Sequence, residues 1–164
     1  SLEHQRHLFG KAYEMRILRS RAGRKGQFVY KETVRVLGQK EASVHLPLVG
    51  PPWEESHIEL SLGDAKLFAS SCAATLQGPA GVVKLKGGVA AGGSSLYCHP
   101  DEAKRLGVRH GDRVELCMAD KPIITFGDVE VRVHPTYTLV AELCMDPSET
   151  FDLHSGMMAQ LVIS

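Results

Sequence analysis

The sequence predicts a mainly β protein that is capped by short α-helices. Three observations support this: apolar and polar residues alternate with a period of two in several short runs, 16 glycines and 8 prolines interrupt nearly every apolar stretch, and short helix-start signals recur. Alternation of this kind is typical of half-buried strands, because successive side chains of a strand point to opposite faces. The clearest runs are 33–37, 113–117, 128–133 and 138–143.

A short element that begins with a helix cap occurs three times. Ser1, Ser61 and His99 each stand where a helix would begin, and the last two are followed three residues later by Asp64 and Glu102. A cap and an acid at this spacing satisfy amide hydrogens that the first helical turn leaves unpaired. The pattern predicts three short helices, two of them preceded by a strand. Duplication of a stable structural unit would explain the repeat without any chemistry.

The remaining segments are assigned in chain order. Residues 11–25 are basic, and the glycines at 23 and 26 predict a loop, whereas residues 27–48 predict a β-meander. Residues 69–93 are small and glycine-rich, which predicts tight turns, and their glycines lack the spacing of nucleotide-binding loops. From residue 94 we expect the third capped helix, a run of antiparallel strands and a last short helix near 147–153. We place a domain boundary near 88–93, giving approximate halves 1–90 and 91–164.

Composition excludes some classes of partner. Nineteen basic and nineteen acidic side chains cancel, so no overall field draws the chain to nucleic acid or to an anionic membrane. No apolar run approaches the roughly 20 residues that span a bilayer. The four cysteines, Cys72, Cys98, Cys117 and Cys144, are widely spaced, which favours reduced thiols over a disulfide framework. We therefore expect a soluble, cytoplasmic protein with neither nucleic acid nor membrane as partner.

Several motifs resemble, in the same order, those of the phosphate propanoyltransferase (PduL-type phosphotransacylase) family. They are the strings 48–65, 78–81, 99–108 with 111–114, and 129–135. The resemblance covers essentially the whole chain from Ser1. It implies two small β-barrels packed together and capped by short helices, and the movement of an acyl group between coenzyme A and phosphate at a two-zinc site. It also implies acyl-CoA and phosphate as small-molecule partners and, as an alternative to free cytoplasm, a place inside a bacterial microcompartment among its proteins.

The positions that the resemblance implies for zinc ligands hold unusual residues. Such chemistry needs positive charge to gather phosphate and to stabilise the oxyanion that develops as phosphate attacks the thioester. Members of the family meet this need with His-x-His pairs on strands. Here the second pair falls on Ser95 and Tyr97, and the later histidine falls at about Glu142. A set of Cys98, His99 and Cys144 is the weaker alternative, with His99 more simply a cap and the cysteines more simply core thiols. We therefore expect no zinc at these positions.

Candidate phosphate- or CoA-binding residues are basic side chains in the first half of the chain: Arg16, Arg19, Arg21, Lys84 and Lys86. Arginine and lysine pair readily with phosphates. The chain has no arginine between Arg35 and Arg105. Catalytic residues remain unassigned.

The function that we predict is that of a phosphate acyltransferase-family protein with a degenerate zinc site and reduced or no turnover. One alternative is an active phosphotransacylase whose metal site is rebuilt or is completed upstream of Ser1, where the first His-x-His pair would lie; we expect a trimmed or processed start. The other alternative is a non-catalytic CoA-binding or assembly module. Coenzyme A is the expected ligand. The sequence does not decide whether the protein forms a homo-oligomer.

Overall fold

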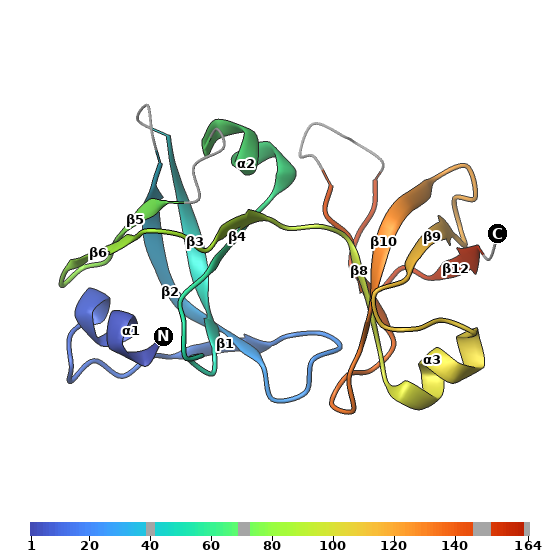
Figure 1. Cartoon of the computed structure of the whole chain (residues 1–164), viewed down its shortest axis with the longest axis horizontal. Coiled ribbons are helices and arrows are strands. Elements are labelled where there is room, and N and C mark those ends of the chain that lie inside the picture. The colour runs from blue at the N-terminus through green and yellow to red at the C-terminus, as the bar shows by residue number, and fades with distance from the viewer. Residues whose placement is uncertain (39–41, 69–72, 146–151, 163–164) are drawn as a thin grey trace. The chain divides into compact units, whose positions relative to one another are not determined.

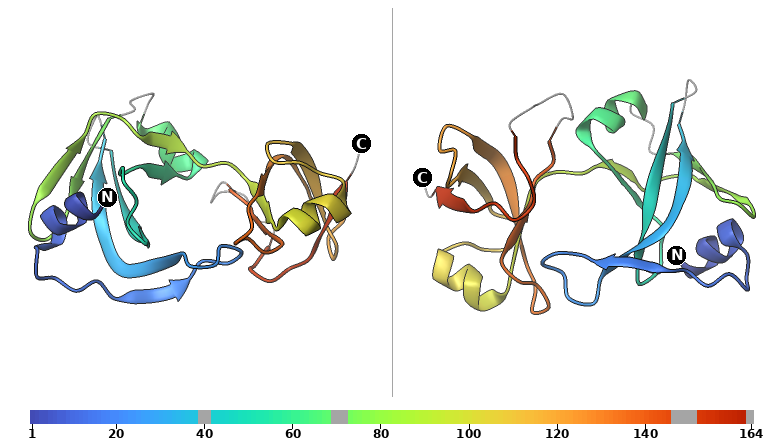
Figure 2. Two further views of the ribbon diagram at one scale, coloured as in Figure 1. Left: turned by 60° about the horizontal axis from the view of Figure 1, so that its bottom comes forward. Right: turned by 180° about the vertical axis from the view of Figure 1, so that it is seen from behind.

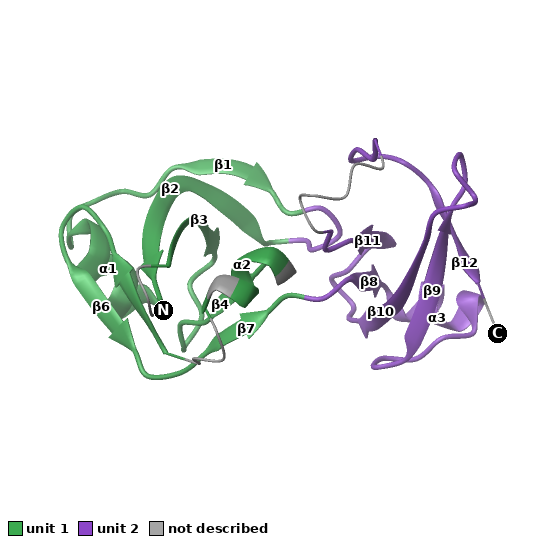
Figure 3. Ribbon diagram, turned by 90° about the horizontal axis from the view of Figure 1, so that it is seen from above, with its two compact units in different colours: residues 1–21, 26–92 green, residues 22–25, 93–164 purple. Residues whose placement is uncertain are grey.

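Two compact units make up the chain, and Figure 3 colours them separately. The computed structural model describes residues 1–38, 42–68, 73–145 and 152–162. Unit 1 contains residues 1–21 and 26–92, and unit 2 contains residues 22–25 and 93–164. Far more of the described residues lie in strands than in helices, which confirms the predicted mainly β class; two packed barrels stay a prediction.

Five strands form the main sheet of unit 1. The order is β1 (Ile17–Ser20), β2 (Phe28–Leu37), β5 (Ala74–Gln77) and β6 (Val82–Leu85), with β3 (Ser43–Gly50) also paired to β2. Along β2 buried and exposed side chains alternate, so that Val34 and Val36 enter the core. Figure 2 shows β2 as a bent strand, and its pairing with β3 shifts register between Val29 and Thr33. A register shift of this kind is typical of a bulge, which bends the strand that carries it.

Both helices of unit 1 begin at the predicted caps. Helix α1 (Leu2–Phe9) starts at Ser1, whose side chain accepts a hydrogen bond from the His4 amide, and it buries its last two residues in the core. Helix α2 (Leu62–Phe68) follows Ser61, whose Oγ accepts from the Asp64 amide at 3.0 Å. Strand β4 (Ile58–Leu60) precedes α2 and pairs in parallel with β7 (Val89–Ala91). The second copy of the repeat is therefore strand, cap and helix, as predicted.

The described part of unit 2 contains one five-stranded sheet and one helix (Figure 1). The strand order is β11 (Val140–Glu142), β8 (Ser95–Cys98), β10 (Thr125–Val133), β9 (Arg113–Met118) and β12 (Ala159–Val162). Helix α3 (Pro100–Leu106) begins at His99 with a complete capping box and ends at Gly107, which has a left-handed φ of 72°. The third copy of the repeat is confirmed.

Two features were not predicted from the sequence, and one prediction falls mainly outside the described residues. Strand β8, which precedes α3, pairs in parallel with β10, whereas β9 pairs antiparallel with β10 and with β12, as expected for the run after the helix. The basic segment 11–25 contains strand β1, whose four residues are all exposed and so give no buried alternation to read. The predicted helix at 147–153 falls mostly on residues outside the described part of the chain, at 147–151.

Each unit has its own apolar core. The core of unit 1 is built on Leu8, Val34, Val36, Leu60 and Phe68, together with residues of β5 and β6. The core of unit 2 is a separate cluster: Leu96, Cys98, Ala103, Val108, Leu116, Val129 and Val131. Three cysteines of the described chain, Cys98, Cys117 and Cys144, are free thiols, as predicted; Cys72 lies outside the described residues. No helix in the described ranges has the length and apolar character needed to cross a membrane.

Candidate functional site in unit 2

Strand β8 is buried along its whole length and carries one polar face. Because β8 lies between β11 and β10, both of its edges are paired. Leu96 and Cys98 belong to the apolar core, so Ser95 and Tyr97 lie on the opposite face of the strand. They are nevertheless only 3% and 4% exposed. Buried polar groups need hydrogen-bond partners, which other parts of unit 2 must supply.

Arg24 is the main partner of this polar face. Its side chain is 7% exposed, and its Nη2 donates hydrogen bonds to the hydroxyl of Tyr97 and to Oε2 of Glu142. The guanidinium carbon also lies 3.9 Å from the centroid of the Tyr97 ring, which is the distance of a cation–π contact. Arg24 Nε is buried and has no hydrogen-bond partner among the described residues. The guanidinium is therefore a desolvated cation.

The main chain fixes the position of Arg24 within unit 2. The amide of Thr138 donates to the Gly23 carbonyl at 3.0 Å, and the amide of Lys25 donates to the Thr136 carbonyl at 3.1 Å. Gly23 has a φ of +70°, and a Cβ built on it would lie 1.9 Å from Cγ1 of Val140. Only glycine satisfies both the left-handed backbone and this close approach. One sequence signal marked the position of Arg24, namely the glycine that precedes it in a basic segment.

The charges of the site are arranged asymmetrically. The Glu142 side chain is 58% exposed, so the ion pair has its cation inside unit 2 and its carboxylate at the edge. Burial raises the pKa of the Tyr97 hydroxyl, although the Arg24 charge and a hydrogen bond with Ser95 act in the opposite direction. Tyr97 is thus a neutral phenol at neutral pH. The face offers two hydroxyls and the buried charge of Arg24, and Arg132 on the neighbouring strand β10, paired with Glu130, is a second cation near Tyr97.

The alternative set of Cys98, His99 and Cys144 is not assembled. Cys98 is fully buried on the core face of β8, and burial followed by the nearby charge of Glu102 raises the pKa of its thiol. His99 caps α3, with Nδ1 accepting from the Asp101 amide at 3.2 Å. Cys144 is held through its amide, which donates to Ser94 Oγ. Within the described ranges no three His, Cys, Asp or Glu side chains lie close enough to share a metal ion.

The predicted phosphate-binding cations do not form one group. Arg16 pairs with Glu32 at 3.1 Å, and Arg19 is exposed on β1. Lys84 is exposed on β6 and Lys86 follows that strand, whereas the sheet order puts β2 and β5 between β1 and β6. Arg21 lies at the end of unit 1 and has interactions of its own. A role for these residues in binding phosphate or coenzyme A stays a prediction.

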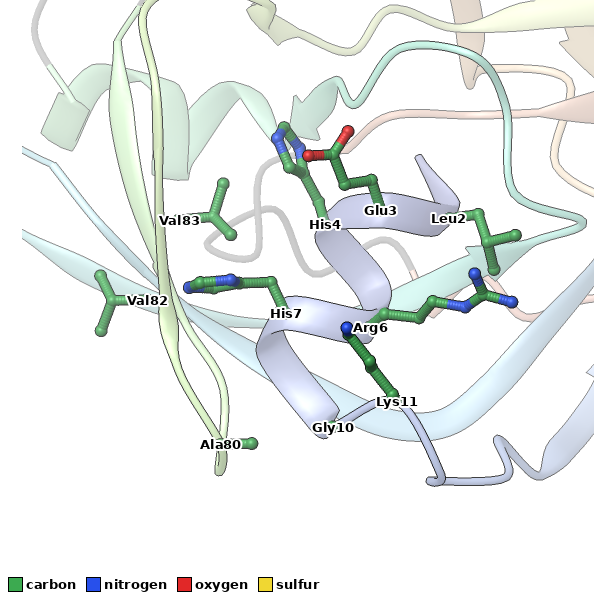
Figure 4. A pocket seen from close by; sticks show the side chains of 10 residues that line it. All are labelled: Leu2, Glu3, His4, Arg6, His7, Gly10, Lys11, Ala80, Val82 and Val83. Atoms are coloured by element: carbon green, nitrogen blue, oxygen red, sulfur yellow. The ribbon is translucent and has the colours of Figure 1, made fainter.

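A groove of unit 1 that the sequence did not indicate lies between α1 and β6 (Figure 4). Its lining combines basic, acidic and apolar residues: Leu2, Glu3, His4, Arg6, His7, Gly10, Lys11, Ala80, Val82 and Val83. Figure 4 shows His7 directed towards the two valines, with Arg6 and Lys11 to one side. His4 Nδ1 lies 2.9 Å from Ser56 Oγ. The groove places two permanent positive charges beside an apolar wall.

The fold and the site define a class of mainly β proteins in which a strand, a capped short helix and a parallel return strand are used in both units. A sequence model described as phosphate propanoyltransferase matches residues 1–154. Proteins called phosphate propanoyltransferase from Sebaldella termitidis and Leptotrichia buccalis are each 30% identical to the chain. These matches cover 95% and 97% of the chain and 79% and 81% of the relatives. The chain belongs to the phosphate propanoyltransferase family.

A more distant relative extends the same match. The phosphate propanoyltransferase of Thermotoga maritima is 27% identical over 94% of the chain and 80% of the relative. A family of this name transfers a propanoyl group to phosphate, and its members use acyl-CoA as substrate. The chain is thus related to acyltransferases over nearly its whole length.

The side chains on the polar face of β8 do not fit zinc. Zinc in proteins takes thiolate, imidazole and carboxylate ligands. Ser95 offers a hydroxyl and Tyr97 a neutral phenol, and the carboxylates beside them, Glu142 and Glu130, pair with Arg24 and Arg132. The donor chemistry of this face therefore matches a bound side-chain cation and not a divalent metal.

Proposed function

We propose that this chain binds coenzyme A as a phosphate propanoyltransferase-family protein and that its rate of acyl transfer is strongly reduced or zero. Family membership supports the ligand class. The reduced rate is inferred from one observation, the hydroxyl-lined face of β8 that is closed by Arg24. The reaction to be tested is propanoyl-CoA plus phosphate giving propanoyl phosphate plus coenzyme A.

The chemistry explains why this face bears on rate. In the forward direction a phosphate oxygen forms a bond to the thioester carbonyl carbon, the carbon–sulfur bond breaks, and the thiolate of coenzyme A takes up a proton. Positive charge must draw in phosphate and stabilise the oxyanion that forms on the carbonyl oxygen. The cations beside this face are Arg24 and Arg132, and each is neutralised by a carboxylate, Arg24 by Glu142 and Arg132 by Glu130. Little net charge is left for a transition state.

The groove between α1 and β6 supports the binding part of the proposal. Coenzyme A carries phosphates at one end and an uncharged pantetheine arm at the other, so a site for it needs cations beside apolar surface. Arg6 and Lys11 line this groove together with Val82 and Val83, the two basic side chains on one side of α1 and the valines on the other. We also propose that each unit is a β-barrel. We propose that the protein is located in the cytoplasm or inside a bacterial microcompartment.

The experiment measures binding and turnover separately. Release of free thiol from propanoyl-CoA is followed with and without phosphate, and binding of coenzyme A is measured by calorimetry. We expect binding without phosphate-dependent thiol release above a no-protein blank. The double variant Arg6→Ala/Lys11→Ala should weaken binding, with the exposed Lys104→Ala as matched control. Absence of binding would refute the proposal, and rapid phosphate-dependent release would favour the alternative of an active phosphotransacylase.

That alternative is favoured by one observation, the family match over residues 1–154. An active enzyme would need cationic help from residues other than those on β8. If thiol release is found, its loss on treatment with a chelator would indicate a metal bound elsewhere on the protein.

A further inference from the structure

We propose that the guanidinium of Arg24 takes the place of a metal ion in unit 2, so that this unit carries a fixed side-chain cation and binds no zinc. The inference uses the family membership of the chain and the geometry of β8. It does not require any turnover of substrate.

The cation lies among the side chains that the family resemblance places at ligand positions. Nη2 of Arg24 donates to Tyr97 and to Glu142, which are two of those three residues. The third, Ser95, lies two residues before Tyr97 on the same face of β8 and is the backbone partner of Glu142 in the pairing with β11. Arg24 therefore binds two members of the set directly, and the third lies beside them on the same face.

Arg24 holds this position through its own surroundings. The ring of Tyr97 lies against the guanidinium carbon at 3.9 Å, and the ring of Tyr137 meets that of Tyr97 edge-on at 5.2 Å. Hydrogen bonds from the flanking main chain to residues 136 and 138 anchor the loop. A guanidinium in water would have solvent on every N–H, whereas Arg24 Nε is buried. Backbone contacts of residues 22–25 thus hold the Arg24 guanidinium inside unit 2.

A zinc ion would have to overcome four obstacles at this place. Tyr97 would have to give up the proton of a buried phenol, and Glu142 would have to leave its ion pair. A doubly charged ion would also lie close to a buried guanidinium, where repulsion is weakly screened. Ser95 would contribute a hydroxyl, which is a poor zinc ligand. A guanidinium meets none of these obstacles because it needs only acceptors and an aromatic face.

A pair of variants tests whether Arg24 excludes the metal. The double variant Ser95→His/Tyr97→His supplies two imidazoles and keeps Arg24, and the triple variant adds Arg24→Ala. The wild-type protein and the double variant should show no visible d–d absorption with cobalt(II), which reports tetrahedral coordination. The triple variant should show this absorption and gain about one zinc per chain relative to the wild type, with Glu142 as third ligand. It should also gain thermal stability on addition of zinc.

Two results would overturn the proposal. One is a double variant that binds cobalt as well as the triple variant does, since Arg24 would then exclude nothing. The other is zinc in the purified wild-type protein that is lost in Tyr97→Phe or Glu142→Gln. Circular dichroism shows whether the triple variant folds. If it does not fold, the second comparison still decides whether the wild-type residues bind zinc. Zinc bound elsewhere on the protein would remain in all variants. The thiol-release assay tests the proposed function independently of these metal measurements.

Discussion

Arg24 illustrates how one buried side chain can determine the character of a site. Its charge is desolvated and is balanced by Glu142, and its stacking on Tyr97 fills the polar side of β8. A buried ion pair is weak evidence for net stability, but removal of its buried member leaves other groups without partners. The Tyr97 hydroxyl is the group most affected, because Glu142 is exposed enough to be rehydrated.

Arg24→Ala should therefore lower the free energy of unfolding by about 1–3 kcal/mol, the typical cost of leaving a buried polar group unpaired. Urea titration followed by circular dichroism measures this. Lys25→Ala is the matched control, because Lys25 is exposed and its structural contact is made by the backbone amide. Equal stability of the Arg24→Ala and Lys25→Ala variants would contradict the prediction.

Glu32 on β2 gives a prediction about pH. It accepts hydrogen bonds from Tyr13 Oη at 3.0 Å and from Arg16 N and Nε at 3.1 Å, although it is only 7% exposed. Burial raises the pKa of this carboxyl, but the hydrogen bonds from Arg16 and Tyr13 outweigh burial, and the net pKa is lowered. A lowered pKa means that the stabilisation is complete above the unfolded-state value, near about 4.3, and is lost as the pH falls through the folded-state value.

The Glu32→Gln variant should consequently be less stable than the wild type at pH 7, by about 1–3 kcal/mol for hydrogen bonds to a charged group. The difference should shrink below about pH 4, where the wild-type carboxyl takes up its proton. Urea midpoints at pH 7, 5 and 3.5 measure it, with the exposed Glu54→Gln as control for the loss of a carboxylate. A difference between wild type and Glu32→Gln that is constant with pH would rule out this account.

At the scale of the element, the sequence predicted what depends on local chemistry. The caps at Ser1, Ser61 and His99 were readable because a cap and its acid lie within one turn of each other. Strand β1 was missed because its residues are exposed and its pairing with β2 comes from tertiary structure. The parallel pairing of β8 with β10 was also missed, since these strands are neighbours in the sheet although α3 and β9 lie between them in the sequence, and no local pattern encodes that order.

The capping box of α3 can be tested directly. His99 Nδ1 accepts from the Asp101 amide, and Glu102 accepts from the His99 amide at 3.1 Å. His99→Ala should lower the free energy of unfolding by about 0.5–2 kcal/mol, whereas His99→Ser, which restores a preferred cap, should recover most of this. Thermal unfolding of the two variants measures the effect. If both variants lose the same stability, His99 acts through something other than its role as a cap.

At the scale of the whole molecule, the candidate site depends on a segment for which the sequence indicated no partner strand. Residues 22–25 appeared as part of a basic loop in the first half of the chain, and the structure groups them with unit 2. The positions 95, 97 and 142 were predicted from the family resemblance, but Arg24 was not among the candidates. Its contacts span 73 and 118 residues of sequence to Tyr97 and Glu142, a separation that no local pattern reveals.

Because the two cores are separate, a substitution in one core should lower protection from hydrogen exchange mainly in the unit that contains it. Leu60 is 1% exposed in the core of unit 1, and Leu116 is 3% exposed in that of unit 2. Truncation of either to alanine should cost about 2–5 kcal/mol, because it removes buried surface and leaves a cavity. Hydrogen exchange followed by mass spectrometry should show faster exchange mainly in β4 and β2 for Leu60→Ala, and mainly in β9 and β10 for Leu116→Ala.

The two variants serve as each other's control, since the same residue type is truncated at similar burial. Local openings draw on the contacts of one cluster, and no residue belongs to both core clusters as described. Faster exchange of both units to the same extent in either variant would mean that the chain unfolds as one cooperative body. Faster exchange confined to one unit would mean that substitutions made in unit 1 to test the groove leave the Arg24 site of unit 2 intact for measurement.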